Sequence, residues 1–268
     1  MDLGTALLVG AIQGITEWLP ISSEAMVALA LVKLLGKELS DAVFIALGLH
    51  IGTLLAAIIY FRHHLVHLMH ALMKDRGDKQ DKPDRPVAVF LLITTIITVG
   101  LAGPLVLFGL EKINFSGAAA MAFIGLMLIL TGLLQEAARR RQASPHARVN
   151  LVDSFLLGVV QALAIFPGLS RSGLTIATFL FRRYEGKVAL ELSFLLSIPL
   201  VAIGTILLLV TGKFTLDFST LMAALSAFVV GLVTINALMK LAERVRFGLI
   251  CIVLGVITVL PFVWELIA

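Results

Sequence analysis

Six apolar stretches, each long enough to cross a lipid bilayer, restrict the fold of this chain more than any other feature. A helix needs about 20 predominantly apolar residues to span the hydrocarbon core. Because hydrophobic residues make up 59% of the chain and charged residues only 14%, a water-soluble domain could not cover the apolar surface. The sequence therefore predicts an all-α, polytopic membrane protein, with spans near residues 41–61, 87–110, 117–137, 188–211, 218–241 and 247–267.

The composition argues against several other classes of protein. The single cysteine, Cys251, excludes a disulfide within the chain and argues against a metal–thiolate site. The N-terminus lacks the basic segment of a cleaved signal peptide. The sequence contains no nucleic-acid motif and no Cys/His metal cluster. We therefore expect the protein to contact membrane lipids, but not nucleic acid, and to use no organic cofactor.

Two pairs of apolar runs are too short to be complete spans. Each run has about 10–18 residues, whereas a span needs roughly 20. We therefore expect each pair to form a re-entrant helical hairpin, which enters and leaves the membrane on one side. The runs cover residues 3–19 and 25–35, separated at Pro20, and residues 151–166 and 174–184, separated by Pro167–Gly173.

The two halves of the chain follow the same plan. Gly10-Ala11-Ile12-Gln13 resembles Gly158-Val159-Val160-Gln161, and a serine, Ser22 or Ser170, lies nine residues after each glutamine. A hairpin followed by three spans crosses the membrane an odd number of times, so the second half begins on the opposite face. We therefore predict two inverted repeats, residues 1–137 (hairpin about 3–35) and 151–268 (hairpin about 151–184), joined by a basic cytoplasmic linker, 138–150.

The basic residues favour this topology. One face would hold sixteen lysines and arginines, the other only Lys33, Lys37, Lys112 and Lys213, and Arg171 would be embedded. Positive charge concentrates on the cytoplasmic side of membrane proteins. We therefore expect a multi-pass protein of the plasma membrane with both termini outside the cytoplasm, hairpin tips that meet near mid-membrane, and a site that opens outward. The sixteen are Arg62, Lys74, Arg76, Lys79, Lys82, Arg85, Arg139, Arg140, Arg141, Arg148, Arg182, Arg183, Lys187, Lys240, Arg244 and Arg246.

The tip of the second hairpin carries an arginine, Arg171, at a depth where membrane helices rarely carry a charged residue. A guanidinium keeps its charge in proteins, so it needs an anionic partner or a wet cavity. Hydroxyls of Ser170, Ser172 and Thr175 surround it, and Gly173 leaves the backbone accessible at the start of a helix. This combination predicts an anion-binding site, most plausibly for phosphate. The alternative is an ordinary loop whose arginine lies in water.

The tip of the first hairpin carries a carboxylate, Glu17, four residues after Gln13 and therefore on the same helix face. Glu17 could be a general base, could bind a divalent cation that bridges a diphosphate, or could only neutralise the arginine of the other tip. Gln13 could orient the carboxylate or be a core glutamine. Ser22 or Ser23 could be a nucleophile activated by Glu17, or only a helix N-cap. Glu24 could be a capping carboxylate.

Both tips resemble the undecaprenyl pyrophosphate phosphatase family of bacterial membranes. The family's first motif corresponds to Gln13, Glu17 and Leu19-Pro20-Ile21-Ser22-Ser23, and its second, Pro-Gly-x-Ser-Arg-Ser-Gly, is matched at every fixed position from Pro167 to Gly173. Leu49–Ala56 and Phe194–Pro199 also look like family segments, so the likeness covers nearly the whole chain. The resemblance implies hydrolysis of a polyprenyl diphosphate to the monophosphate and inorganic phosphate, which recycles the lipid carrier of cell-wall synthesis. It also implies a site reached from outside the cell and two re-entrant hairpins in inverted repeats.

One position departs from the family pattern. The family continues Ser-Ser-Thr-Gly-His, and its histidine has been given a catalytic role, whereas this chain reads Ser22-Ser23-Glu24-Ala25-Met26. The thioether of Met26 cannot transfer protons. The histidine is therefore dispensable, or His50 or Glu24 substitutes for it, or the activity is altered or lost. His50 lies in the middle of an apolar span, where a purely structural role is the alternative.

These residues lead to a hypothesis for the reaction. Arg171, with Ser170, Ser172 and backbone N–H groups near Gly173, would grip the diphosphate and stabilise charge on the transferred phosphoryl group. Glu17 would activate a serine or a water, with Mg²⁺ or Ca²⁺ held between Glu17 and the phosphates as one option. The predicted site residues are Glu17, Ser22, Ser23 and Arg171 for catalysis, and Gln13, His50, Ser170, Ser172, Gly173 and Thr175 for substrate binding.

Two other functions remain open from the sequence. Inverted repeats with broken helices are also a transporter design, so the protein could move a polyprenyl phosphate or a small anion across the bilayer. The missing histidine also fits a catalytically silent, lipid-binding relative. A homodimer is a further open possibility for its assembly.

Overall fold

The computed structural model describes residues 1–73, 84–109, 117–144 and 148–267. Lys74, Arg76, Lys79, Lys82 and Lys112, which the charge count includes, lie outside these ranges, as does the 145–147 part of the predicted linker. All regular structure in the described residues is helical. The helices are α1 (Leu3–Thr16), α2 (Ser23–Leu35), α3 (Leu39–Tyr60), α4 (Arg62–Met73), α5 (Asp84–Phe108), α6 (Gly117–Arg139), α7 (Leu151–Leu163), α8 (Arg171–Phe181), α9 (Gly186–Val210), α10 (Phe218–Arg244) and α11 (Phe247–Ile267).

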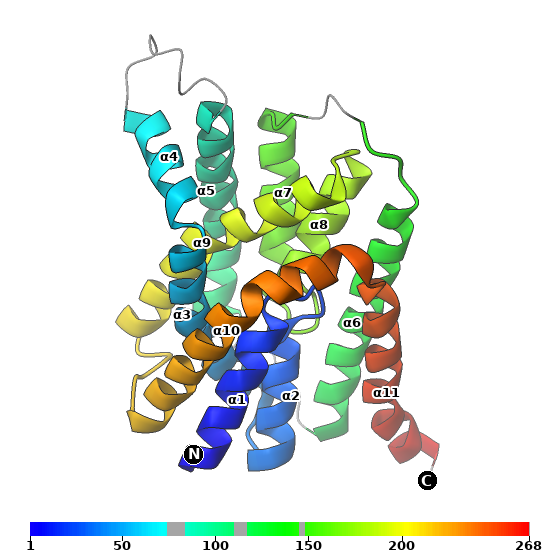
Figure 1. The fold of residues 1–268 in the computed structure, drawn as a ribbon. Helices are drawn as coiled ribbons and strands as arrows, with labels where there is room; N and C mark the ends of the chain where they lie inside the picture. The colour runs from blue at the N-terminus through cyan, green and yellow to red at the C-terminus, as the bar shows by residue number, and fades with distance from the viewer. Residues whose placement is uncertain (74–83, 110–116, 145–147, 268) are drawn as a thin grey trace.

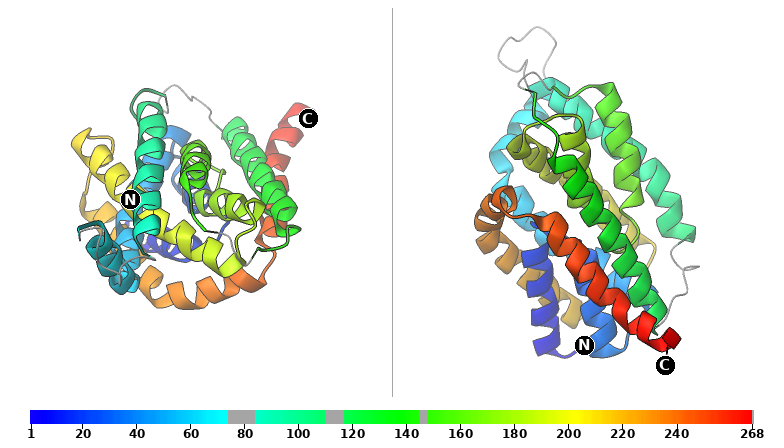
Figure 2. Two further views of the ribbon diagram at one scale, coloured as in Figure 1. Left: turned by 90° about the horizontal axis from the view of Figure 1, so that it is seen from above. Right: turned by 90° about the vertical axis from the view of Figure 1, so that its right-hand side faces the viewer.

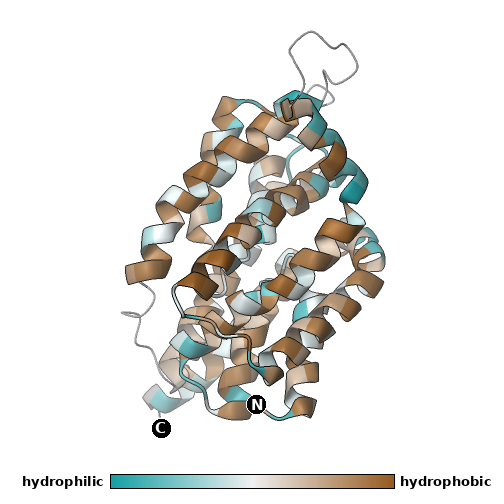
Figure 3. Ribbon diagram, turned by 90° about the vertical axis from the view of Figure 1, so that its left-hand side faces the viewer, coloured by the Kyte–Doolittle hydropathy of each residue, from teal (hydrophilic) through white to brown (hydrophobic). Residues whose placement is uncertain are grey.

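Six of these helices, α3, α5, α6, α9, α10 and α11, are long and apolar enough to span a membrane, which confirms the six predicted spans. Large apolar side chains such as Ile96, Val233 and Val253 are more than half exposed on them. Apolar residues predominate along the helices, and polar residues gather toward the two ends of the molecule (Figure 3). This pattern is expected of surfaces that face lipid tails rather than water.

The two short pairs occupy opposite ends of the molecule. Helices α1 and α2 lie at the end that holds both termini, and α7 and α8 lie at the other end (Figure 1). The segments that connect the members of each pair meet near the middle, where the Ser172 hydroxyl donates a hydrogen bond of 3.4 Å to the Leu19 carbonyl. Helix α10 packs along α1 and α3, and α5 packs along α7 and α9 (Figure 2).

The sequence of each connecting segment explains why its helices stop. Pro20 and Pro167 have no N–H to donate, so the chain turns at both places. Ser22 caps α2 with a left-handed φ of 66°, and its Oγ accepts a hydrogen bond from the Ala25 N–H at 3.3 Å. Gly168 has a φ of 100°, which side chains rarely adopt, and Ser170 then caps α8. The two breaks therefore place a helix N-terminus at each tip.

Close helix packing fixes the tips in place. The buried Trp18 indole donates a hydrogen bond of 3.1 Å to the Gly231 carbonyl, which ties the first tip to α10. Helix α6 crosses α11 at paired glycines: a Cβ on Gly132 would lie 2.4 Å from the Gly248 carbonyl oxygen. Small residues of this kind let membrane helices approach closely. Close packing of α6, α10 and α11 thus supports the two tips.

One described segment differs from the sequence expectation. The spans predicted near 41–61 and 87–110 leave residues 62–86 as a connecting loop, yet Arg62–Met73 form α4. Leu68 and Ala71 are buried where α4 packs against α5, while the histidines of this segment are largely exposed. An amphipathic helix of 12 residues is too short to register as a span, so an analysis based on span length overlooked it.

Candidate active site

An ion pair joins the two hairpin tips. Glu17 follows α1 and Arg171 begins α8, and Arg171 Nη2 donates a hydrogen bond to Glu17 Oε1. The Glu17 side chain is only 5% exposed and that of Arg171 only 12%. The sequence predicted that these two charges would meet, and the structure brings them together. Each charge gives the other the partner that a buried position demands.

The second oxygen of Glu17 accepts further hydrogen bonds. Gln13 Nε2 donates to Oε2 at 3.1 Å, and Ser23 Oγ donates to the same atom at 2.6 Å. His50 Nε2 lies 3.1 Å from it. These contacts fix the orientation of the carboxylate. They also place an acceptor at the right distance to remove the Ser23 proton.

The two candidate serines of the first tip have different surroundings. Ser22 accepts a hydrogen bond from the backbone and starts α2, which is the N-cap role that the sequence left open. Ser23, one residue later, donates directly to Glu17. Only Ser23 therefore has the contact with a base that an attacking hydroxyl needs.

In the second tip, Ser170 and Ser172 stay close to Arg171. The Ser170 Oγ accepts a hydrogen bond from the Gly173 N–H at 3.1 Å and lies 3.3 Å from the Ser172 Oγ. The Ser170 N–H in turn donates to Thr131 Oγ1 at 3.2 Å. The start of α8 is thus held in place by its own cap and by α6.

Gly173 and Thr175, the other predicted binding residues, contribute to packing in the described structure. The Gly173 N–H is used by the cap, and a Cβ on Gly173 would lie 2.6 Å from Gln135 Nε2. Thr175 Oγ1 donates to the Arg171 carbonyl at 2.8 Å and lies 2.5 Å from the Ser193 Oγ of α9. The structure therefore places both residues where they support the position of Arg171.

The tips line a small polar cavity. Its walls carry two carboxylates, a guanidinium, an imidazole and four hydroxyls. The guanidinium and the hydroxyls are groups that can bind phosphate oxygens. It is lined by Glu17, Ser22, Ser23, Glu24, His50, Ser170, Arg171 and Ser172.

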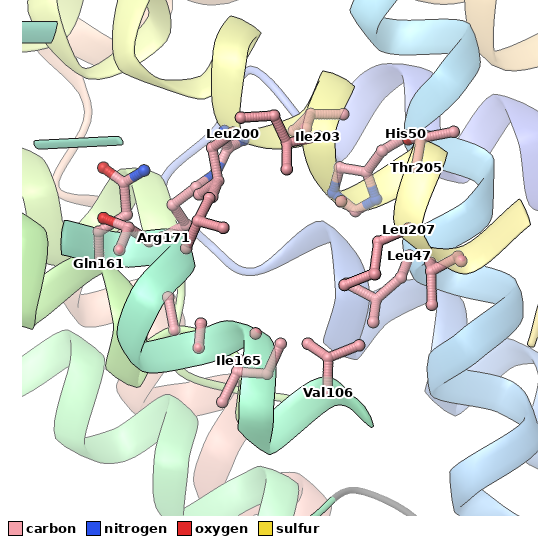
Figure 4. Close-up of a pocket in the computed structure, with 18 of the residues that line it drawn as sticks. Leu47, His50, Val106, Gln161, Ile165, Arg171, Leu200, Ile203, Thr205 and Leu207 are labelled. Atoms are coloured by element: carbon pink, nitrogen blue, oxygen red, sulfur yellow. The ribbon is translucent and has the colours of Figure 1, made fainter. Parts of the chain in front are cut away.

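A second, larger cavity shares part of its lining with the first. Most of its lining residues come from α5 and α9, with apolar side chains such as Val99, Val106, Leu200 and Leu207. Three residues, Glu24, His50 and Arg171, line both cavities. Figure 4 shows the cavity with Arg171 and His50 on opposite walls. Sequence reasoning missed this cavity because its apolar walls look like ordinary parts of membrane spans.

The imidazole of His50 lies within hydrogen-bonding distance of the Glu17 carboxylate. The Ala46 carbonyl can only accept, so His50 Nδ1 carries the proton in their 2.9 Å contact, and Nε2 faces Glu17. Nε2 is also 3.9 Å from Glu24 Oε1. Met26, by contrast, is partly buried and packs against the apolar cluster of α1, α2 and α3. An imidazole from α3 thus contacts the carboxylate of the first tip, where the sequence has Met26 at the family's histidine position.

Among the described residues, no group of three or more histidine, cysteine or acidic side chains is arranged to hold a metal ion. Both oxygens of Glu17 already accept hydrogen bonds. The Glu24 carboxylate lines both cavities and is 14% exposed, so it is better placed than Glu17 to meet a cation.

A polar cavity that shares lining residues with an apolar one, inside a bundle with six candidate spans, is typical of a membrane protein that handles an amphipathic anionic lipid. Comparison with known proteins gives the particular family. The family model described as bacitracin resistance protein BacA matches residues 6–257, and the chain belongs to that family.

Several curated relatives carry the name undecaprenyl-diphosphatase. The protein from Methanococcoides burtonii is 42% identical over 262 residues, which cover 97% of this chain and 98% of the relative. The protein from Methanopyrus kandleri is 37% identical and covers 97% of this chain and 96% of the relative. That from Haloarcula marismortui is 35% identical and covers 93% of both.

Proposed function

We infer that this protein is an undecaprenyl-diphosphatase, a membrane enzyme that hydrolyses undecaprenyl diphosphate to the monophosphate and inorganic phosphate. The observation that carries this conclusion is that an apolar and a polar cavity share three lining residues, Glu24, His50 and Arg171. The apolar walls suit the isoprene units next to the diphosphate, and the charged and hydroxyl groups of the other cavity suit phosphate. The full-length relatives of that name support the same activity.

In the proposed reaction, the terminal phosphoryl group of the substrate occupies the polar cavity. Ser23 Oγ attacks its phosphorus while the hydroxyl proton passes to Glu17 Oε2, 2.6 Å away. The bond from phosphorus to the bridging oxygen breaks, and the lipid monophosphate leaves with that oxygen. Glu17 passes this proton to the oxygen of the leaving monophosphate. Water then attacks the phosphoserine and gives a proton to Glu17, which returns it to Ser23 Oγ as inorganic phosphate leaves. Arg171 stabilises negative charge on the phosphoryl oxygens in both steps.

A divalent cation fits this arrangement at Glu24 rather than at Glu17. The Glu24 carboxylate lines both cavities, and the hydrogen bonds to Glu17 would have to break before Glu17 could ligate an ion. Mg²⁺ or Ca²⁺ bound with the substrate would neutralise charge on the diphosphate oxygens, which otherwise face two carboxylates.

His50 is proposed to exchange the proton that Glu17 receives, since its Nε2 is 3.1 Å from Glu17 Oε2. His50→Gln is expected to lower kcat by about 10²-fold, the lower end of what general acid–base groups contribute. Met26→His is expected to bring no gain, because that side chain packs in the apolar cluster. The kcat of both variants in purified form tests this. A large gain from Met26→His, or wild-type rates in His50→Gln, would contradict the assignment.

The finer topology is also part of the proposal: two re-entrant hairpins in inverted repeats, with both termini outside. The helix contacts support it, because several of them recur when α1, α2, α3, α5 and α6 are exchanged with α7, α8, α9, α10 and α11. Helix α1 packs on α10 as α7 packs on α5, and α2 packs on α3 as α8 packs on α9. Both termini lie at the same end of the molecule in Figure 1, which also agrees with this topology.

Cysteine labelling tests this orientation, since Cys251 is buried and can be replaced by serine. In that background, a cysteine introduced at the exposed Leu216 is expected to react with a membrane-impermeant maleimide in intact spheroplasts. One at the exposed Gln142 is expected to react only after permeabilisation. The reverse pattern would contradict the topology.

Purified protein incubated with undecaprenyl diphosphate tests the activity itself. We expect release of one inorganic phosphate for each lipid monophosphate formed. A transporter or a silent lipid-binding relative would bind the lipid without releasing phosphate, and a leaflet-specific lipid assay in vesicles would then separate those two alternatives.

A further inference from the structure

Three residues that line the apolar cavity have buried polar groups without a hydrogen-bond partner in the described structure. One is Gln161, on α7, with both the oxygen and the nitrogen of its side-chain amide unpaired; the others are Arg171, through Nη1, and Thr205, through Oγ1. Gln161 is only 2% exposed. Buried polar groups are nearly always paired in folded proteins, so unpaired ones that face a cavity indicate a missing ligand.

The repeated sequence explains why the Gln161 amide lacks a partner. Gln13, at the matching position of the first half, donates to Glu17 four residues later. Four residues after Gln161 the chain has Ile165, which also lines the cavity and cannot accept a hydrogen bond. The second half therefore has the glutamine of the first half, but no side chain four residues later that could accept a hydrogen bond from its amide.

Arg171 connects this amide with the polar cavity. Its Nη2 donates to Glu17, while its Nη1 has no protein partner. In Figure 4, Gln161 and Arg171 lie on the same wall of the apolar cavity, opposite Leu47, His50 and Leu207. One guanidinium thus has a nitrogen bonded to the first tip and a second nitrogen without a partner in the described structure, on the wall that also holds the amide.

We propose that Gln161 and Arg171 Nη1 bind the lipid-linked phosphate of the substrate, the phosphate that stays on the product. The inference rests on the proposed function and adds a residue that the sequence motifs do not single out as part of the site. The terminal phosphoryl group occupies the polar cavity, and Arg171 lies between the two phosphates. Gln161 supplies N–H groups to phosphate oxygens and is a binding residue with no part in proton transfer.

This assignment makes an unusual prediction for stability. Gln161→Leu removes an unpaired polar group and keeps a similar volume, so the free protein should unfold at the same or a higher temperature. A structural glutamine would give the opposite sign. Thr94→Val is the matched control, because Thr94 is buried on α5, its Oγ1 is also unpaired, and it lines neither cavity.

Direct binding measurements on purified protein test the proposal independently of turnover. The ligands are undecaprenyl monophosphate, inorganic phosphate and the uncharged alcohol undecaprenol. For Gln161→Leu we expect the Kd of undecaprenyl monophosphate to rise by about 10-fold or more, as for loss of a hydrogen bond to a charged group. The Kd values of inorganic phosphate and of undecaprenol should not rise, and Thr94→Val should leave all three unchanged.

An unchanged Kd for undecaprenyl monophosphate in Gln161→Leu would overturn the proposal. So would a weaker affinity for all three ligands together with a lower unfolding temperature, because that pattern means a structural role. A wild-type protein that binds these lipids but releases no phosphate from undecaprenyl diphosphate would refute the proposed function alone, since the binding comparison would still decide the role of Gln161.

Discussion

Arg171→Ala is expected to lower kcat/KM for phosphate release from undecaprenyl diphosphate by about 10³-fold or more. Arginines that stabilise a transferring phosphoryl group contribute about 10³–10⁵ to the rate. Here the loss is compounded, because Glu17 would keep its buried charge without the guanidinium that pairs with it. Arg171→Lys should recover only part of the activity, since an ammonium cannot bond Glu17 and phosphate oxygens in the same planar fork.

Two controls separate this chemical role from folding. Arg182→Ala removes another arginine next to α8, one that pairs with Asp153 and lines neither cavity, and should leave kcat/KM close to wild type. The double variant Glu17→Gln/Arg171→Met removes both charges at once. It should unfold at a higher temperature than Arg171→Ala and remain inactive. Near-normal phosphate release by Arg171→Ala would refute the role of this residue.

Ser23→Ala and Ser22→Gly are expected to differ by orders of magnitude although the residues are neighbours. Ser23→Ala removes the hydroxyl that donates to Glu17, and we expect kcat to fall by about 10³-fold, with residual activity only from water. Ser22→Gly removes a cap at a φ of 66°, a conformation that glycine adopts freely, so it should cost only a few tenths of a kcal/mol and keep most of the activity.

Single-turnover kinetics on the two variants test this difference, with thermal unfolding to confirm that both remain folded. Acid-quenched wild-type enzyme should also carry phosphate on Ser23, detectable by mass spectrometry of the peptide. If Ser22→Gly proves to be the inactive variant, or if Ser23→Ala turns over normally, the attacking group is not Ser23.

Much of the fold and the centre of the site could be predicted from the sequence, because a charged side chain inside a membrane needs an oppositely charged partner or a wet cavity. Glu17 and Arg171 each interrupt an apolar run, and their mutual contact follows from the need of each for a partner. The six spans follow from length and hydropathy alone. The contact of Gln13 with Glu17 could likewise be predicted, since their spacing of four residues puts both on one helix face.

The features that escaped prediction depend on contacts between distant segments. Hydropathy cannot tell Leu200 or Val106, which line a cavity, from neighbours that face lipid. Gln161 served only as a marker of the repeat, because nothing local shows that its amide lacks a partner. Thr175 fits an anion-binding loop by sequence, yet it bonds Ser193 of α9, and only tertiary structure reveals that partner.

Phosphate release from undecaprenyl diphosphate by the purified wild-type protein tests the central claim most directly, with Glu17→Gln as the inactive reference. We expect stoichiometric inorganic phosphate and undecaprenyl monophosphate from the wild type, and almost none from the variant. Bound but uncleaved undecaprenyl diphosphate in the wild-type sample, or equal release by both proteins, would contradict it.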